Sequence, residues 1–327
     1  MWNDLGVLFL SVLALILVSR FLGRLAMSLG QPSIIGEIFA GIMLGPALLG
    51  LIKPSSGLSA ISTVAVFMIV FSAGLEMELS KIVAVLRQKG ILVALFSFVI
   101  PLCAGLGIGM AFHLGTLHSW ILGLVMAVTA LPVAVRILET FGLLDSIVGS
   151  YTIVIAVVND IVVFLALTLA MQASRSASSS GIFRTGGLAV GKLGLLILLI
   201  WVCARALYKM KPGKFGGRWG YGCAVALGLG FGLVSMALGF HFAIGAFFGA
   251  LILRADLFGA RQFEEFRGLF RRITSLALAP VFFGCVGLAT VVKGLPSLGF
   301  VAAVILFSIF SKILAGWLVG WGGERAF

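Results

Sequence analysis

The sequence predicts an all-α polytopic membrane protein with about eleven transmembrane helices and an external N-terminus. Hydrophobic residues make up 61% of the 327 residues and charged residues only 10%, whereas soluble domains carry about 25% charged residues. The apolar runs are continuous and do not alternate with polar residues, which favours helices over a membrane β-barrel. Basic residues gather in alternate connections between the runs, which indicates the orientation.

The predicted spans are bounded by charged residues, Pro or Gly. Each apolar run has the length needed to cross a hydrocarbon layer of ~30 Å, although the run at 240–255 is short. The runs lie at 4–24, 33–50, 58–77, 91–112, 119–138, 147–171, 188–208, 219–237, 240–255, 273–292 and 297–321. The Ser- and Gly-rich stretch 174–187 is predicted to be an external loop between two groups of spans.

The distribution of Lys and Arg decides the number of spans and their orientation. With the N-terminus outside, the internal connections carry most of the basic residues, above all in 205–218 and 254–272. Merging the two runs around Gly239-Phe240-His241 would move the 254–272 cluster outside, so two separate spans are predicted there. The net charge of +12 therefore indicates membrane topology and contact with anionic lipid, and not nucleic-acid binding. The external connections carry only Lys53, Arg175, Arg184 and Lys293.

Cysteine and histidine do not form a metal or disulfide pattern. The four Cys residues lie in apolar runs without C-x-x-C spacing, and the three His residues lie at span ends. The sequence also contains no nucleophile–base set and no nucleotide-binding fingerprint. It therefore predicts neither an enzyme with catalytic residues nor a protein with a resident cofactor or metal.

One carboxylate lies in the middle of an apolar run. Asn159-Asp160 interrupts the predicted span 147–171, where an Asp costs roughly 2.5–3.5 kcal/mol at the centre of a membrane helix. A low dielectric disfavours the ionised form, so such a group holds either a proton or a desolvated cation. If it is exposed alternately to the two sides, it exchanges one for the other. The Asn159 amide either supplies an oxygen to the cation or orients the carboxylate.

A proline interrupts the neighbouring span. Thr129-Ala130-Leu131-Pro132 lies in the middle of 119–138, where Pro132 removes a main-chain donor and is expected to kink or unwind the helix. The freed carbonyls and the Thr129 hydroxyl can then bind a cation, as in the broken helices of secondary transporters. The alternative is a kink used for packing, with Thr129 bonded to its own helix.

Lys312 is a second charge deep within a span. Counting 1.5 Å per residue from opposite surfaces places Lys312 and Asp160 at about the same depth, so the two are expected to pair or approach closely. The alternative is that Lys312 extends its side chain to the cytoplasmic interface.

Three further charges lie toward the cytoplasmic ends of their spans. Glu37 and Glu76 are expected to be structural, and Arg136 lies one turn beyond Pro132, where it can pair with Glu37, Glu76 or Glu139. Glu37, Glu76 and Arg136 therefore form a predicted cytoplasmic-side polar network.

These motifs, in this order, resemble the monovalent cation:proton antiporters, in particular the bacterial sodium/hydrogen-exchanger and Kef-type branch. The resemblance covers the whole chain. The residues that carry it are the second-span signature QPSIIGEIFAGIMLGP at 31–46, the third-span motif FSAGLE at 71–76, TALP at 129–132 with RIL at 136–138, Asn159-Asp160, PVFF at 280–283 with VGL at 286–288, and Lys312.

The resemblance implies an inverted-repeat helical bundle, with a first repeat at 1–172 and a second repeat at 188–327. It also implies an elevator-like exchange of Na⁺ or K⁺ for H⁺ by a homodimer in the inner or plasma membrane. Asp160, Asn159 and Thr129 would bind the cation and the proton, Lys312 would be the charge partner, and Pro132 would mark the helix break.

The sequence departs from the family pattern in two places. Asn159 stands where many members carry a first acidic residue, which favours electroneutral exchange. The chain ends soon after the eleventh predicted span, before the family's second unwound helix, so an incomplete second repeat is expected. The alternative to a transporter is therefore a non-transporting homologue with a sensing or scaffolding role.

Overall fold

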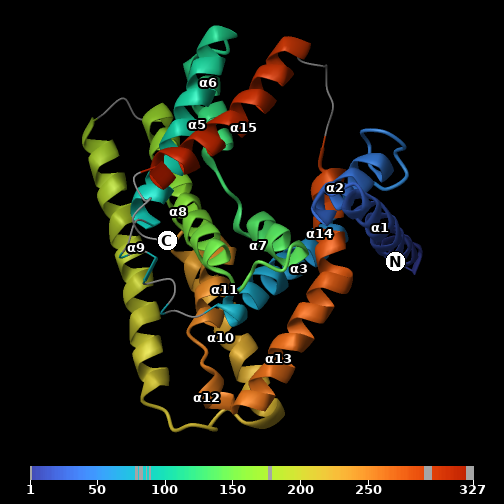
Figure 1. The fold of residues 1–327 in the computed structure, drawn as a ribbon, viewed down its shortest axis with the longest axis vertical. Helices are drawn as coiled ribbons and strands as arrows, with labels where there is room; N and C mark the ends of the chain where they lie inside the picture. Colours follow the sequence, from blue (N-terminus) through green and yellow to red (C-terminus); the bar gives the residue numbers. More distant parts are fainter. Residues whose placement is uncertain are drawn as a thin grey trace. The chain divides into compact units, whose positions relative to one another are not determined.

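In the computed structural model, every regular element among the described residues is a helix (Figure 1). The chain divides into two compact units, each assembled from separate stretches of sequence. We describe each unit by itself. The structure describes residues 2–77, 80, 84–85, 87, 90–175, 179–290 and 297–321, so the predicted external Lys293 lies outside the described residues.

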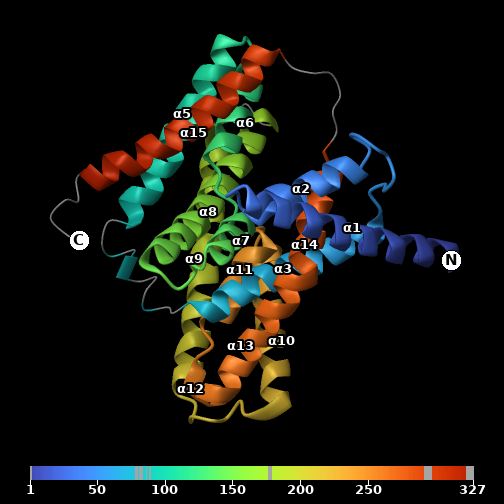
Figure 2. The same ribbon diagram turned by 45° about the vertical axis from the view of Figure 1, so that its right-hand side comes forward.

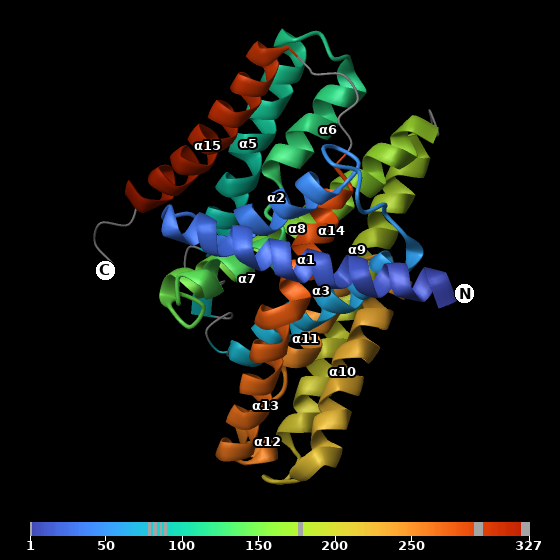
Figure 3. The ribbon, with the colours of Figure 1, turned by 90° about the vertical axis from the view of Figure 1, so that its right-hand side faces the viewer.

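Unit 1 comprises Met1–Glu78, Pro132–Ser146 and Leu196–Lys293. Within it, α2 contacts both α1 and α14, and α3 contacts α11 and α14 (Figure 3). Its helices are α1 (Trp2–Ser28), α2 (Ser33–Leu44), α3 (Ser56–Glu76), α7 (Leu131–Thr140, from Pro132 onward), α10 (Gly217–Ala237), α11 (Phe242–Leu251), α12 (Ala255–Phe258), α13 (Ala260–Ile273), the π-helical turn Thr274–Leu278 and α14 (Ala279–Leu288).

Unit 2 comprises Leu79–Leu131, Ile147–Leu195 and Gly294–Phe327. Helix α5 is its centre, because it contacts α6, α8 and α15; α5 and α15 run side by side in Figure 2. A small apolar core of Phe98, Leu124 and Ala127 joins α5 to α6. The helices are α5 (Ile91–Ala111), α6 (Thr116–Ala127), α8 (Ile147–Arg175) and α15 (Leu298–Trp321), and α9 (Ser179–Tyr208) is divided between the two units.

Each predicted span contains a helix among its described residues. Eight helices in the described part of the chain are long and apolar enough to cross a membrane. The other three predicted spans correspond to the shorter apolar helices Ser33–Leu44 and Phe242–Leu251 and to the segment Ile147–Asp160 of α8. Two predicted interruptions are confirmed: α10 ends at Ala237 before α11, and α6 ends at Ala127 before α7.

Three predicted boundaries are wrong. Helix α2 ends at Leu44 and not at residue 50, because Gly45 precedes Pro46 and a residue before proline avoids the helical conformation. The predicted loop 174–187 is helical at 174–175 and again from Ser179, since serine and alanine do not forbid a helix.

The third error concerns 254–272, which was predicted to be a connection and contains α12 and α13. Helix α13 continues through the π-helical turn into α14. Its apolar side chains Phe263, Phe266 and Phe270 recur at helical spacing and are buried, whereas its Arg and Glu residues interrupt the apolar sequence, so no continuous apolar run marks this helix.

Glycine allows α2 to pack closely against both of its neighbours. A Cβ atom at Gly36 would overlap the main chain of Leu22 in α1, and one at Gly41 would overlap the carbonyl of Gly284 in α14. The contact is reciprocal, since a Cβ at Gly287 would overlap the carbonyl of Ile38. Small residues permit such close approach of helices in membrane proteins. The close packing fixes the position of Glu37, which lies between Gly36 and Gly41.

Gly41→Leu is expected to destabilise unit 1, because its side chain would meet the backbone of α14. The expected loss is about 1–3 kcal/mol or more, the range for overpacked interiors. Thermal unfolding of the purified protein in detergent measures it. Gly6→Leu is the matched control, since nothing lies within 4 Å of a Cβ at Gly6. Equal stability of the two variants would contradict this packing.

Candidate functional site

The predicted site residues Asn159 and Asp160 lie on α8 within unit 2. Asn159 is fully buried, whereas Asp160 is half-buried. The Asn159 amide nitrogen lies 3.5 Å from the Ser97 hydroxyl oxygen, to which it donates. Its amide oxygen is buried and has no hydrogen-bond partner among the described residues. A buried acceptor without a partner is uncommon and indicates space for a ligand or water.

The backbone between α6 and α7 is interrupted beside this pair. The last helical bond of α6 joins Val128 N–H to Leu124 O at 3.0 Å, and α7 begins at Leu131. Pro132 then stands in the first turn of α7, where a missing N–H is tolerated. The main-chain N–H of Leu131 lies beside the Asp160 carboxylate. The predicted helix break is therefore present, and it lies next to the predicted carboxylate.

Lys312 on α15 does not take its expected partner. Its ammonium donates to the Ala127 carbonyl at 2.8 Å, to the Thr129 hydroxyl at 2.9 Å and to the Ser97 carbonyl at 3.3 Å. No ion pair between Lys312 and Asp160 is found in the described part of the chain. An ammonium has three protons, and here each has an uncharged oxygen acceptor. The alternative of an extension to the interface is also not observed, because the head group points to α5 and the helix break.

The oxygens in unit 2 have the chemistry of a cation site. The Asp160 carboxylate, the Asn159 amide oxygen, the Thr129 hydroxyl and the Ala127 carbonyl are all hard oxygen donors. One of them carries a negative charge that is only half-buried. Oxygen donors of these kinds bind monovalent cations in general, and a carboxylate can also bind a proton.

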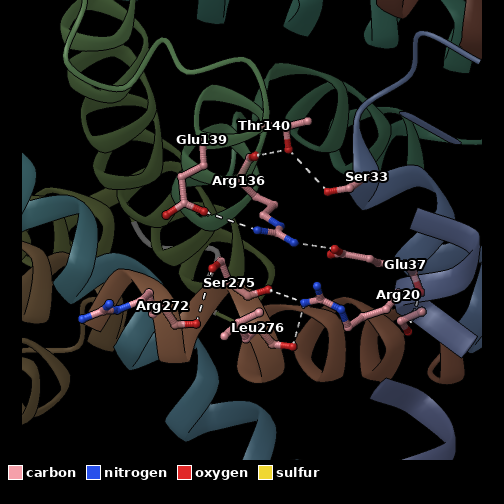
Figure 4. Close-up of polar contacts among 10 residues, drawn as sticks. Arg20, Ser33, Glu37, Arg136, Glu139, Thr140, Arg272, Ser275 and Leu276 are labelled. Carbon is pink, nitrogen blue, oxygen red and sulfur yellow. Dashed lines mark hydrogen bonds and ion pairs between the residues drawn. The ribbon is translucent and has the colours of Figure 1, made fainter. Parts of the chain in front are cut away.

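The predicted polar network lies in unit 1 and is organised around Arg136 (Figure 4). Its guanidinium contacts the Glu37 carboxylate at 2.5 Å and the Glu139 carboxylate at 3.5 Å. Glu37 is only 2% exposed, so the pair joins α7 to α2 inside the protein. Two of the three partners predicted for Arg136 are thus confirmed. The Thr140 hydroxyl reinforces this junction, since it donates to the Arg136 carbonyl at 2.9 Å and lies 3.3 Å from the Ser33 hydroxyl.

The third predicted partner, Glu76, does not pair with Arg136, although both residues line one cavity. Its nearest cation is Arg271 on α13, at 3.9 Å. One buried oxygen of each of Glu37, Glu76 and Glu139 has no hydrogen-bond partner among the described residues. The cavity has a volume of about 450 Å³. The sequence does not predict Arg271 as a partner of Glu76, because α13 lies in a stretch that is predicted to be a connection.

Arg20 on α1 completes the wall of this cavity. It donates to the carbonyls of Ser275 at 3.4 Å and Leu276 at 3.0 Å, within the π-helical turn (Figure 4). No pattern in the sequence indicates this contact, because it depends on a local change of helical hydrogen bonding.

In unit 2, sequence reasoning missed Ser97 and Pro101 on α5. The available signal was a polar residue four positions before a proline within an apolar run.

Comparison with known proteins places these features in a family. The model of the sodium/hydrogen exchanger transmembrane family matches residues 8–325. The chain is 30% identical to Cation/H(+) antiporter 18 of Arabidopsis thaliana, over 93% of this chain and 40% of the plant protein. It is 25% identical to the probable Na(+)/H(+) antiporter GerT of Bacillus cereus, over 95% of this chain and 81% of that protein.

A solved structure shows the same fold. The sodium proton antiporter MjNhaP1 of Methanocaldococcus jannaschii superposes with a TM-score of 0.68 at 19% identity, covering 99% of this chain and 80% of that one. The chain thus spans about two fifths of the plant relative and about four fifths of the bacterial and archaeal ones. This multi-pass membrane protein therefore belongs to the sodium/hydrogen exchanger family, a family of transporters and not of enzymes.

Proposed function

We propose that the protein exchanges a monovalent cation, Na⁺ or K⁺, for protons by alternating access, with Asp160 as the shared carboxylate. The observation that carries the proposal is the position of Asp160 beside the interruption between α6 and α7, close to the main chain of Leu131. Support comes from relatives named as a Na(+)/H(+) antiporter of Enterococcus hirae and a Na(+)/H(+)-K(+) antiporter of Bacillus cereus. Both are 26% identical to this chain.

In the proposed mechanism the cation and the proton compete for one carboxylate. When Asp160 is ionised, its charge attracts the cation, and the Asn159 and Thr129 oxygens replace part of the hydration shell. When Asp160 is protonated, the charge that holds the cation is lost. Exposure of the site to each side in turn then couples the two fluxes, because a low dielectric disfavours an ionised carboxylate without a cation.

The proposal assigns a structural role to the Glu37–Arg136 pair. Removing one partner of a buried ion pair leaves an uncompensated charge, which is strongly destabilising. The pair holds α7 on α2 within unit 1. As the resemblance implies, we place the protein in the cell membrane as a homodimer.

Asp160→Asn is expected to abolish cation-triggered pH change in everted membrane vesicles, because an amide cannot carry the exchanged proton. Asp256→Asn is the matched control, since Asp256 is exposed and paired with Arg254 outside the site. It should retain the activity of the parent. Equal activity of Asp160→Asn and the parent would remove Asp160 from the mechanism. An inactive parent would instead favour the non-transporting alternative.

Exchange is expected to be electroneutral, because the site offers one carboxylate where many relatives offer two. The cation flux in proteoliposomes should then be the same with and without an imposed membrane potential. Asn159→Asp adds a second carboxylate and is the comparison variant, for which a dependence on potential is expected. A cation flux of the parent protein that changes clearly with the membrane potential would contradict this prediction.

A further inference from the structure

We propose that α5 is part of the transport site: Pro101 frees the Ser97 carbonyl to hold Lys312, and Lys312 must leave its three oxygens before a cation binds there. We call these oxygens, Ser97 O, Ala127 O and Thr129 Oγ1, the lysine seat. The inference rests on the proposed function and names positioning residues for it, Pro101 and Ser97.

The first acceptor exists because of a proline. In a continuous α-helix the carbonyl of residue 97 accepts a hydrogen bond from the N–H of residue 101. Pro101 is buried within α5 and has no N–H, and its ring repels that carbonyl. The Ser97 carbonyl is therefore without its helical donor, and the Lys312 ammonium lies 3.3 Å from it. An alanine at residue 101 would restore the helical donor and compete with Lys312.

The second acceptor exists because of the helix break. Without the interruption, the Ala127 carbonyl would accept from the N–H of Leu131. In the structure the carbonyl accepts instead from Lys312 at 2.8 Å. Lys312 thus takes the place of the missing helical donor. The Leu131 N–H on the other side of the break lies near Asp160.

The lysine seat overlaps with the proposed cation ligands. The Thr129 hydroxyl and the Ala127 carbonyl face the ammonium at 2.9 and 2.8 Å, which leaves no room for a metal ion on the same lone pairs. Two positive charges on shared oxygens would also repel each other strongly in a low dielectric. Lys312 therefore competes with the cation for neutral oxygens of the break, and the strength of the seat sets the apparent cation affinity.

Ser97 connects the seat to Asn159. Its carbonyl holds Lys312, while its hydroxyl donates to Ala94 O at 3.0 Å and accepts from the Asn159 amide nitrogen. This contact turns the Asn159 amide oxygen, which has no partner in the described structure, away from Ser97. The same residue thus positions both the lysine and one proposed cation ligand.

Cation-dependent thermal stabilisation of the purified full chain in detergent tests the proposal without requiring transport. Sodium and potassium chloride are titrated against Lys312→Met, Pro101→Ala and the double variant. Lys312→Met should lower the half-stabilising cation concentration by about tenfold, and Pro101→Ala by a few-fold, because each weakens hydrogen bonds to a charged group. In the Lys312→Met background, Pro101→Ala should have no further effect. Gly107→Ala, on an open face of α5, is the control and should change nothing.

The double variant separates positioning from helix geometry. If Pro101 acts only by bending α5, Pro101→Ala will shift the cation affinity equally in both backgrounds, which overturns the proposal. An unchanged affinity in Lys312→Met overturns it too. Pro101→Val also restores the N–H and replaces Pro101→Ala if the latter does not fold.

Asp160→Asn distinguishes this failure from failure of the proposed function. If cation stabilisation depends on Asp160 but not on Lys312, only the seat is wrong. If Asp160→Asn leaves the cation-dependent stabilisation unchanged, the proposed function is wrong. The proposed role of the lysine seat is then wrong as well.

Discussion

The interruption of the helix between Ala127 and Leu131 is the feature on which the polar structure of unit 2 depends. A main-chain carbonyl or N–H that loses its helical partner in an apolar environment must find another partner, because an unpaired group costs several kcal/mol there. In this protein the Ala127 carbonyl is satisfied by Lys312. The Leu131 N–H at the other end of the break lies near Asp160. The break therefore offers the Lys312 ammonium a partner and stands next to the carboxylate.

In unit 1, too, buried polar groups have partners, but here the groups are charged side chains and not main-chain atoms. Glu37, Arg136 and Glu139 form a charged cluster whose members lie largely out of contact with solvent. Buried charges are tolerated when they are paired and hydrogen-bonded. The pairing is possible because α2 packs closely against α1 and α14 through glycine, which fixes Glu37 opposite Arg136. In unit 1 the ion pair therefore depends on the close packing of α2.

Much of the architecture could be predicted from the sequence. Apolar runs located all the helices that correspond to spans, and Pro132 located the break, because both signals are local. The amphipathic helix α13 was missed because its buried face consists of Phe263, Phe266 and Phe270 among charged residues, so its mean hydropathy is low. The end of α2 was misplaced because hydropathy outweighed the Gly45-Pro46 signal.

The partners of individual charges were harder to predict. Depth along the helices placed Lys312 and Asp160 at one level, and opposite charges at one level were expected to pair. The acceptors that Lys312 takes include two main-chain carbonyls, which the pattern of polar side chains in the sequence does not reveal. Those carbonyls become available only through Pro101 and the break, and their positions relative to α15 depend on the tertiary structure. Arg136 was easier, because two of its three candidate partners do lie next to it.

In the proposed mechanism a cation and a proton exclude each other at Asp160. Proton release on cation binding tests this exclusion most directly, with the purified protein in weakly buffered detergent solution and a pH indicator. Adding Na⁺ or K⁺ is expected to release protons from the parent and none from Asp160→Asn. Cation binding without proton release from the parent, or equal release from both proteins, would contradict it.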